Sequence, residues 1–431
     1  MIRNREYVIE KSRLKGIEAL PGVLEAETGG NILRWYISKV TDTEIYIETT
    51  LYNEEVKKVE ESFSGNIIET LYPGKSVVLS VIPTGIGCAI GGYAADAAPA
   101  TALLASCTDY LITNPNAVNA SNFIFMENNT LYTEGFVIDL FCKGLVNLYK
   151  TYSNQVGLII EKTEKENLEV VFNIINTVRA VHAINIEHYI VTDEPIGGRC
   201  EQGKSGAYVG RIDNPGVLFK ACEYLIKKGV DAVAVTSMIN DLPAENYIKH
   251  FEGKHPNPVG GAEAIISHLI CKKYKIPAAH APMTNLKELA LRDNIVDARG
   301  AGEFSSASGL ACILIGLNHA PQISGTNRFR IKDAVNINNL LAVVAPASAL
   351  GGIPMLYAAR HNIPIIAVKE NETILDVTQK RLRLNHVIEV NNYAEAAGIL
   401  QALRKGISIS SIYRPLETLR PYEVTGGKIG K

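Results

Sequence analysis

Two patterns of apolar residues alternate along the chain from about residue 76 onward. Short, continuous apolar runs are typical of buried strands, and longer stretches with apolar residues every three or four positions indicate amphipathic helices. Such alternation predicts a doubly wound, mostly parallel α/β sheet. The predicted strands are 77–82, 110–113, 156–160, 189–192, 232–236, 341–344, 364–368 and 386–390, and the clearest predicted helices are 166–182, 214–228, 261–273 and 393–405.

Residues 1–75 carry more charge than the rest and indicate a separate, small α+β unit. Two strand patterns, at 32–38 and 44–50, are joined by a short polar turn, and 55–63 could supply a covering helix. We interpret this unit as a cover or an oligomerisation arm that contributes few polar groups to the main pocket, and we expect a homo-oligomer. Residues 76–431 form the α/β domain, with a candidate boundary between two lobes near 325–338.

Two glycine-rich turns follow predicted strands and resemble each other. Glycine lets a backbone turn tightly, and free N–H groups near a helix start attract phosphate or carboxylate. We therefore expect the turns to face one anion-binding crevice, although a purely structural turn is an alternative. The spacing of the first turn also fits a nicotinamide-cofactor loop, but the acid expected after the second strand is missing. The candidate ligand-binding residues are Thr84, Gly85, Gly87, Gly91 and Gly92 in the first turn, and Ser348, Gly351 and Gly352 in the second.

Composition and charge indicate which partners to exclude and which cellular compartment to expect. The 431 residues carry a net charge of −2, which argues against nucleic acid as a partner. Seven cysteines without a C-x-x-C pair predict a reducing, cytoplasmic setting. The first residues lack a signal-type apolar segment. The charge-free stretches 77–95 and 340–359 contain proline and glycine, which favours buried strand–turn–helix units over membrane spans.

Polar residues also follow several predicted strands, where ligands bind in wound sheets. Asn114 and Asn116 follow the second strand and Asn371 follows the strand at 364–368. The long loop after 189–192 carries residues suited to a charged small molecule: Asp193, Arg199, Lys204 and Ser205. The letters of a phosphate loop occur there too. Its strand and helix context is wrong, so nucleotide hydrolysis is disfavoured.

Histidines gather between 250 and 280, together with Glu263. No H-E-x-x-H spacing occurs, and His268 lies five residues after Glu263, so it is not on that residue's i+4 face. We assign no metal ligands. The candidate acid–base residues are Asp193, Glu263, His268 and His280, with ordinary packing of the histidines as the alternative. We expect His280 to line the main pocket. Glu134 and Asp139 are interpreted as residues near a helix start rather than as bases.

Several separated motifs resemble the domain of unknown function 3326, a family of cyanobacteria and some other bacteria. They are PTGIG at 83–87, GGY at 91–93, GGAEAIISH at 260–268, HAP at 280–282 and APASALGG at 345–352. The resemblance covers about residues 76–400 and leaves out 1–75. At 114–116 this chain has Asn-Pro-Asn, where the family pattern has His-Pro-Asn, which weakens a metal or acid–base role for position 114. The family implies no known activity.

Together these patterns predict an enzyme of small-molecule metabolism. It would bind a carboxylate- or phosphate-bearing metabolite on the glycine turns and perform acid–base chemistry of lyase, isomerase or hydrolase type without a redox cofactor. A non-catalytic metabolite-binding protein and an assembly subunit of a biosynthetic enzyme are the alternatives. The substrate, and any other cofactor, stay open.

Overall fold

The computed structural model describes residues 1–52, 74–83, 85–120, 123–124, 126–240, 244–283, 295–306, 308–323 and 331–419. Within them, short runs of three to seven residues, most of them buried, build one large parallel sheet. Its strands are β4 (Val77–Ser80), β5 (Tyr110–Thr113), β8 (Thr130–Tyr132), β18 (Leu340–Pro346), β19 (Ile365–Val368) and β20 (Val387–Val390). They lie in the order β20-β19-β18-β4-β5-β8, and every neighbouring pair is parallel.

A second parallel sheet holds the middle of the chain. Its strands are β10 (Val156–Ile160), β11 (Tyr189–Val191), β14 (Ala232–Ser237) and β16 (Ala278–Pro282), in the order β11-β10-β14-β16. The predicted α/β class, with mostly parallel strands, is confirmed, and the strands form two sheets rather than one. Strand β16 was not predicted, because Pro277 argues against a central strand. The structure resolves this point: Pro277 precedes β16, and β16 is an edge strand.

Helices cover both faces of each sheet, as the burial of every residue along the central strands requires. On the large sheet, α3 and α10 pack on one face, and α2 and α12 on the other. On the second sheet, α5 and α7 lie on one face, and α4 and α9 on the other. These helices are α2 (Ala98–Ala105), α3 (Gly135–Cys142), α4 (Lys165–His182), α5 (Pro215–Lys227), α7 (Gly260–Tyr274), α9 (Gly309–Asn318), α10 (Ile353–Arg360) and α12 (Tyr393–Arg404).

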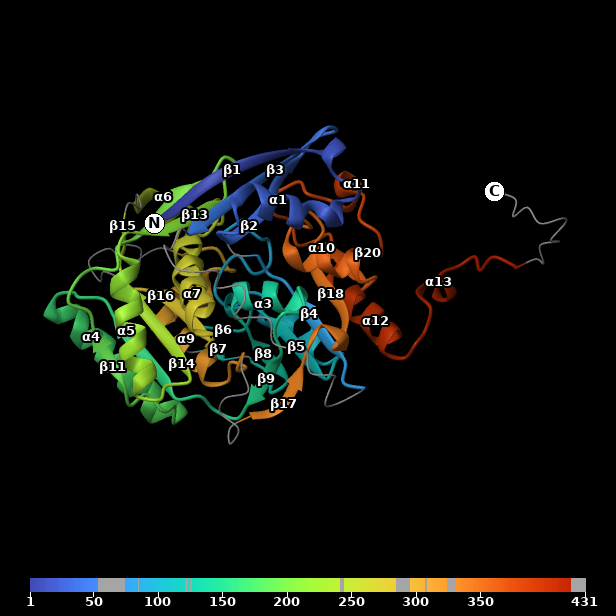
Figure 1. Ribbon diagram of the computed structural model, residues 1–431. Helices are drawn as coiled ribbons and strands as arrows, with labels where there is room; N and C mark the ends of the chain where they lie inside the picture. Colours follow the sequence, from blue (N-terminus) through green and yellow to red (C-terminus); the bar gives the residue numbers. More distant parts are fainter. Residues whose placement is uncertain are drawn as a thin grey trace.

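Helix α7 occupies the centre of the molecule, between the two sheets (Figure 1). It packs against β16 on one side and against the hairpin of β12 (Gly198–Gln202) and β13 (Tyr208–Ile212) on another. Helix and hairpin touch through glycines, because a Cβ on Gly210 would lie 2.3 Å from Ala262 Cα, and one on Gly261 would lie 2.7 Å from Tyr208 O. The Gly-Gly-Ala start of this helix is therefore a packing requirement.

The N-terminal residues form an antiparallel sheet of β1 (Ile2–Glu10), β2 (Ile32–Val40) and β3 (Glu44–Tyr52), in the order β1-β3-β2. Helix α1 (Leu20–Thr28) joins β1 to β2. The predicted small N-terminal α+β unit is thereby confirmed, whereas the helix expected at 55–63 lies outside the described residues. The sheet crosses the top of the molecule above α7 and α10 (Figure 1).

Short elements complete the described chain. They are β6 (Asn119–Ala120), β7 (Phe123–Ile124), β9 (Leu148–Thr151), β15 (Ile239–Asn240), β17 (Ile331–Val335), α6 (Ala244–Phe251), α8 (Ala301–Ser305), α11 (Gln379–Leu382) and α13 (Ile409–Ile412). Strand β17 pairs with β9 and lies in the candidate boundary at 325–338, of which residues up to 330 lie outside the described set.

The second glycine turn packs against strand β2 of the N-terminal sheet, and this contact predicts an effect on stability. The Ile37 N–H donates to Gly351 O at 3.0 Å, and a Cβ on Gly351 would lie 2.6 Å from Ile37 Cβ. Gly351→Ala should therefore lower the free energy of unfolding by about 1–3 kcal/mol through overpacking. Gly216→Ala is the matched control, since no atom lies within 4 Å of its added Cβ, and it should be neutral or stabilising by up to about 1 kcal/mol. Equal effects of both substitutions in denaturant titrations would contradict this.

Candidate functional site

A cavity of about 240 Å³ lies among elements of the two parallel sheets, their helices and the N-terminal sheet. The carboxyl ends of β4 and β5, one face of α7, the start of α3, strand β16, the second glycine turn and strand β2 all border it. Six of the residues predicted from the sequence line it: Asn114, Glu263, His268, His280, Gly351 and Gly352. Segments that are far apart in the chain thus meet at one site.

One face of α7 lines the cavity through Gly260, Glu263, Ala264, Ser267 and His268. The spacing argument that separated His268 from Glu263 considered only direct i+4 neighbours. The two residues instead flank a common stripe whose middle is Ala264 and Ser267. Both side chains therefore reach the same cavity, although they do not lie directly above one another on the helix.

The first carboxylate–imidazole pair is Glu134 with His268. Glu134 precedes α3, and its Oε2 accepts a hydrogen bond from the Phe136 N–H at 2.9 Å, which caps the helix. Its Oε1 contacts His268 Nδ1 and accepts a longer hydrogen bond from Ser267 Oγ at 3.4 Å. The interpretation of Glu134 as a helix-start residue is confirmed, but it left out the second oxygen, which faces the site.

The second pair is Glu263 with His280. His280 Nδ1 lies 3.8 Å from Glu263 Oε1, and His280 Nε2 is hydrogen-bonded to Ser237 Oγ at 2.8 Å. The imidazole is fully buried, whereas 19% of the Glu263 side chain is exposed. Among the described residues Nδ1 has no hydrogen-bond partner. The expectation that His280 lines the main pocket is met, and Glu263 is the member of the pair that a ligand reaches first.

Buried carboxyl groups near the site have unusually high pKa values. Burial raises the pKa of Asp139, which lines the cavity, to about 7, against the opposing charges of Lys143, His268 and Arg34. Burial also raises the pKa of Glu303 to about 7, and the charge of Glu263 adds to that rise. Carboxyl groups that titrate near neutrality are suited to proton transfer.

The N-terminal sheet contributes to this cavity, contrary to the expectation from composition. Arg34, Trp35, Tyr36 and Ile37 of β2 all line it. Two of the four are polar, and Arg34 supplies a positive charge. An alternating strand with an arginine is ordinary in sequence, so no local signal distinguishes these residues from a solvated sheet face.

The first glycine turn donates several of its N–H groups inside the protein. The Ala89 N–H donates to Glu372 O, the Ile90 N–H to Asn371 Oδ1, and the Gly91 N–H to Asp96 Oδ2. The turn still requires glycine, because Gly91 has a φ of 95° and a Cβ there would lie 1.9 Å from Ile82 Cγ2. Gly85, Gly87 and Gly92 belong to the same turn, and Thr84 lies outside the described residues.

Two asparagines predicted as ligand contacts bind the backbone of these turns. Asn114 accepts from the Ile82 N–H at 2.9 Å and donates to Ile82 O at 2.8 Å. Asn371, fully buried, makes the same pair of bonds with Ile90 at 2.9 Å each. Their amides therefore position the turn beside the cavity. The side chain of Asn116 lies outside the described set, and Ser348 Oγ is hydrogen-bonded to Thr373 Oγ1.

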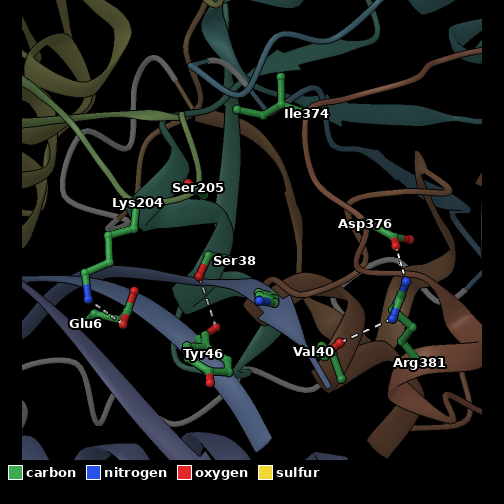
Figure 2. Close-up of a pocket in the computed structure, with 10 residues that line it drawn as sticks. Glu6, Ser38, Val40, Tyr46, Lys204, Ser205, Ile374, Asp376 and Arg381 are labelled. Carbon is green, nitrogen blue, oxygen red and sulfur yellow. Dashed lines mark hydrogen bonds and ion pairs between the residues drawn. The ribbon is translucent and has the colours of Figure 1, made fainter. Parts of the chain in front are cut away.

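The loop residues after β11 lie away from the histidines. Asp193 makes an exposed ion pair with Lys220, and Arg199 pairs with Asp213 across the β12–β13 hairpin. Lys204 pairs with Glu6, and the Ser205 N–H donates to Glu48 Oε1. Lys204 and Ser205 border a separate cavity of about 330 Å³ against the N-terminal sheet (Figure 2). Arg199, Lys204 and Ser205 belong to the β12–β13 hairpin, and Asp193 precedes it. None of these residues lines the cavity that contains Glu263.

The remaining histidines of the predicted cluster are used for packing. His250 is buried and stacks on Tyr93 with 4.3 Å between ring centroids, and burial lowers its pKa to about 4. His250 Nδ1 donates a hydrogen bond to His255 O at 3.0 Å. Within the described ranges, no group of three or more His, Cys, Asp or Glu residues could hold a metal ion.

Within the described parts of the chain, no helix is long and apolar enough to span a bilayer. The cytoplasmic location stays a prediction, as do the homo-oligomer and the absence of nucleic-acid and membrane partners.

Comparison with known proteins places the chain among uncharacterised relatives. Over 334 residues it is 34% identical to an uncharacterised lipoprotein of Synechococcus sp., and the match covers 77% of this chain and 92% of that protein. No solved structure matches it. The model of the family described as "Protein of unknown function (DUF3326)" matches residues 76–413, which contain the Glu263–His280 and Glu134–His268 pairs. The chain therefore belongs to the DUF3326 family.

Proposed function

We propose that this protein is a non-redox enzyme of small-molecule metabolism that transfers a proton on an anionic substrate, in a reaction of lyase, isomerase or hydrolase type. One observation carries the proposal: two carboxylate–imidazole pairs, Glu134–His268 and Glu263–His280, border one cavity. Proton transfer needs an acid and a base that converge on one substrate, whereas a binding site needs only fixed donors and acceptors.

Glu263 is the proposed general base. Its side chain is the accessible member of its pair, and the buried imidazole of His280 lies 3.8 Å behind it. Ser237 Oγ bonds the far nitrogen of that imidazole and orients the ring. The His280 imidazole is thus a second polar group beside Glu263, and it can stabilise either protonation state of the carboxyl.

His268 and Asp139 are the proposed acids. Glu134, held by the start of α3, fixes His268 through Nδ1, so the other ring nitrogen is left to exchange a proton. Asp139 lines the same cavity and has a pKa of about 7 because of burial, so it holds a proton that it can release near neutral pH. A non-catalytic metabolite-binding protein is the alternative, and the first experiment below separates the two.

Isotope exchange tests the proposal without knowledge of the full reaction. The protein is incubated in deuterium oxide with α-keto, β-keto and α-hydroxy carboxylic acids, and loss of the acidic C–H signal is followed by NMR. We expect exchange with at least one acid, and a drop of about a hundredfold or more in Glu263→Gln, because the base is removed. The exposed Glu187 supplies the control Glu187→Gln, which should exchange normally. Acids that bind without any exchange would favour the binding protein.

His280→Asn tests the second member of this pair. We expect exchange per folded molecule to fall by roughly a hundredfold with little change in melting temperature, since the amide cannot take up the proton. Because the imidazole is fully buried, the melting temperature is measured beside the exchange rate. A lower melting temperature with normal exchange per folded molecule would assign His280 to packing alone.

The raised pKa of Asp139 predicts a pH-dependent effect on stability. Its pKa is raised from 3.8 to about 7 on folding, so the unfolded chain releases this proton first. Asp139 therefore costs no stability below the unfolded value, and its cost grows from there to about pH 7 and is complete above it. Asp139→Asn should accordingly gain melting temperature over the wild type between about pH 5 and about pH 8. A difference between variant and wild type that is constant with pH would contradict the shift.

A further inference from the structure

The positive charge at the cavity comes from outside the family domain. The family match begins at residue 76, whereas Arg34 belongs to β2 of the N-terminal sheet. Among the described lining residues, Arg34 is the one lysine or arginine. The groups proposed for proton transfer all lie inside the family match. The charge that could hold an anionic substrate is therefore contributed by a separate part of this chain.

Arg34 has no carboxylate in direct contact among the described residues. Its guanidinium lies over the Tyr36 ring, with 5.4 Å from Cζ to the ring centroid, and this contact leaves the N–H edge of the plane unoccupied. The acid whose charge it influences in the cavity is Asp139, and burial keeps that carboxyl protonated over much of the neutral range. The guanidinium N–H groups can therefore donate to the carboxylate of a ligand.

The strand that carries Arg34 is hydrogen-bonded both to the family domain and to the neighbouring strand β3. The Ile37 N–H donates to Gly351 O at 3.0 Å, and Lys272 Nζ donates to Ile32 O at 3.4 Å. The Tyr36 hydroxyl donates to Glu48 Oε2 at 2.6 Å and lies 3.4 Å from Ser205 Oγ. The backbone on either side of Arg34 is thus held in place before a ligand arrives, which lowers the entropy that binding must overcome.

The rest of the cavity favours a small acid with an apolar body. Its wall includes Trp35, Ile138, Ile313, Met355 and Leu375. A single guanidinium matches the two oxygens and the single charge of a carboxylate, whereas a phosphate carries more charge and needs more donors.

We infer that the N-terminal sheet is the substrate-recognition part of this protein, and that Arg34 binds the carboxylate of a small acid with an apolar body. The family domain then supplies the acid–base groups of the same cavity. This inference deepens the proposed function and rests on it for the statement that the acid is a substrate.

Binding of simple acids tests the inference directly. Benzoate, phenylacetate and isovalerate, each compared with its neutral amide, are titrated against the full chain by ligand-observed NMR. We expect at least one acid to bind, its amide to bind about tenfold or more weakly, and Arg34→Met to weaken the acid by about ten- to a hundredfold without affecting the amide. Arg34→Lys should restore part of the affinity. Arg5→Ala, an exposed position on β1, is the control.

The outcomes separate this inference from the proposed function. Equal binding of acids and amides, unchanged acid binding in Arg34→Met with a normal melting temperature, or no binding of any acid would overturn the role of Arg34. Acid binding that depends on Arg34, in a protein that catalyses no isotope exchange, would leave the recognition role standing and reject the enzyme.

Discussion

The arrangement of the site depends on the close contact between α7 and the β12–β13 hairpin. Gly210 and Gly261 let helix and strand approach to a distance that no side chain would allow, because an added Cβ on either would overlap backbone atoms. A helix buried on most sides normally presents apolar residues in every direction. Here α7 also carries Glu263 and His268 into the interior, where the cavity leaves them a polar boundary. Without that approach, the two pairs would not share one space.

Carboxylates of this chain occupy donor groups that a sequence can mistake for an anion site. Asp96 accepts from the first glycine turn, and Glu48 accepts from the Ser205 N–H of the loop with phosphate-loop letters. The buried Glu161 likewise accepts from the N–H groups of Ile196, Gly197 and Met238. In each case backbone donors that cannot reach water are paired with an internal anion, which lowers the cost of burying both. A donor-rich turn is therefore evidence for a negative charge, and its own chain is one source of that charge.

The sequence predicts features that leave a local pattern better than features that depend on contacts between distant segments. Apolar runs located most of the parallel strands, because burial on both faces leaves a strong local pattern, and amphipathic patterns located α4, α5, α7 and α12. The buried helices α3, α9 and α10 were not among the clearest predicted helices. His280 was assigned to the pocket from its place in the chain, although the strand that holds it was doubted because of Pro277. Arg34 was missed since its role comes from the docking of β2 against Gly351, which is a contact between distant segments. Asn371 was misjudged for the same reason: its partner, Ile90, is remote in sequence.

The charged groups around the cavity come from two parts of the chain, the family domain and the N-terminal sheet. The family domain brings Glu134, Asp139 and Glu263 to one cavity, where burial raises the pKa of Asp139 and the charge of Glu134 adds to that rise. Loss of solvent is the main cause of that rise, and the charges of Lys143, His268 and Arg34 oppose it. Arg34 approaches from the N-terminal sheet and lowers the pKa of that same carboxyl. An anion that neutralised Arg34 would remove this stabilisation of ionised Asp139 and so strengthen its hold on the proton. Docking of the sheet and occupancy of the cavity are thereby linked to the protonation of an acid in the family domain.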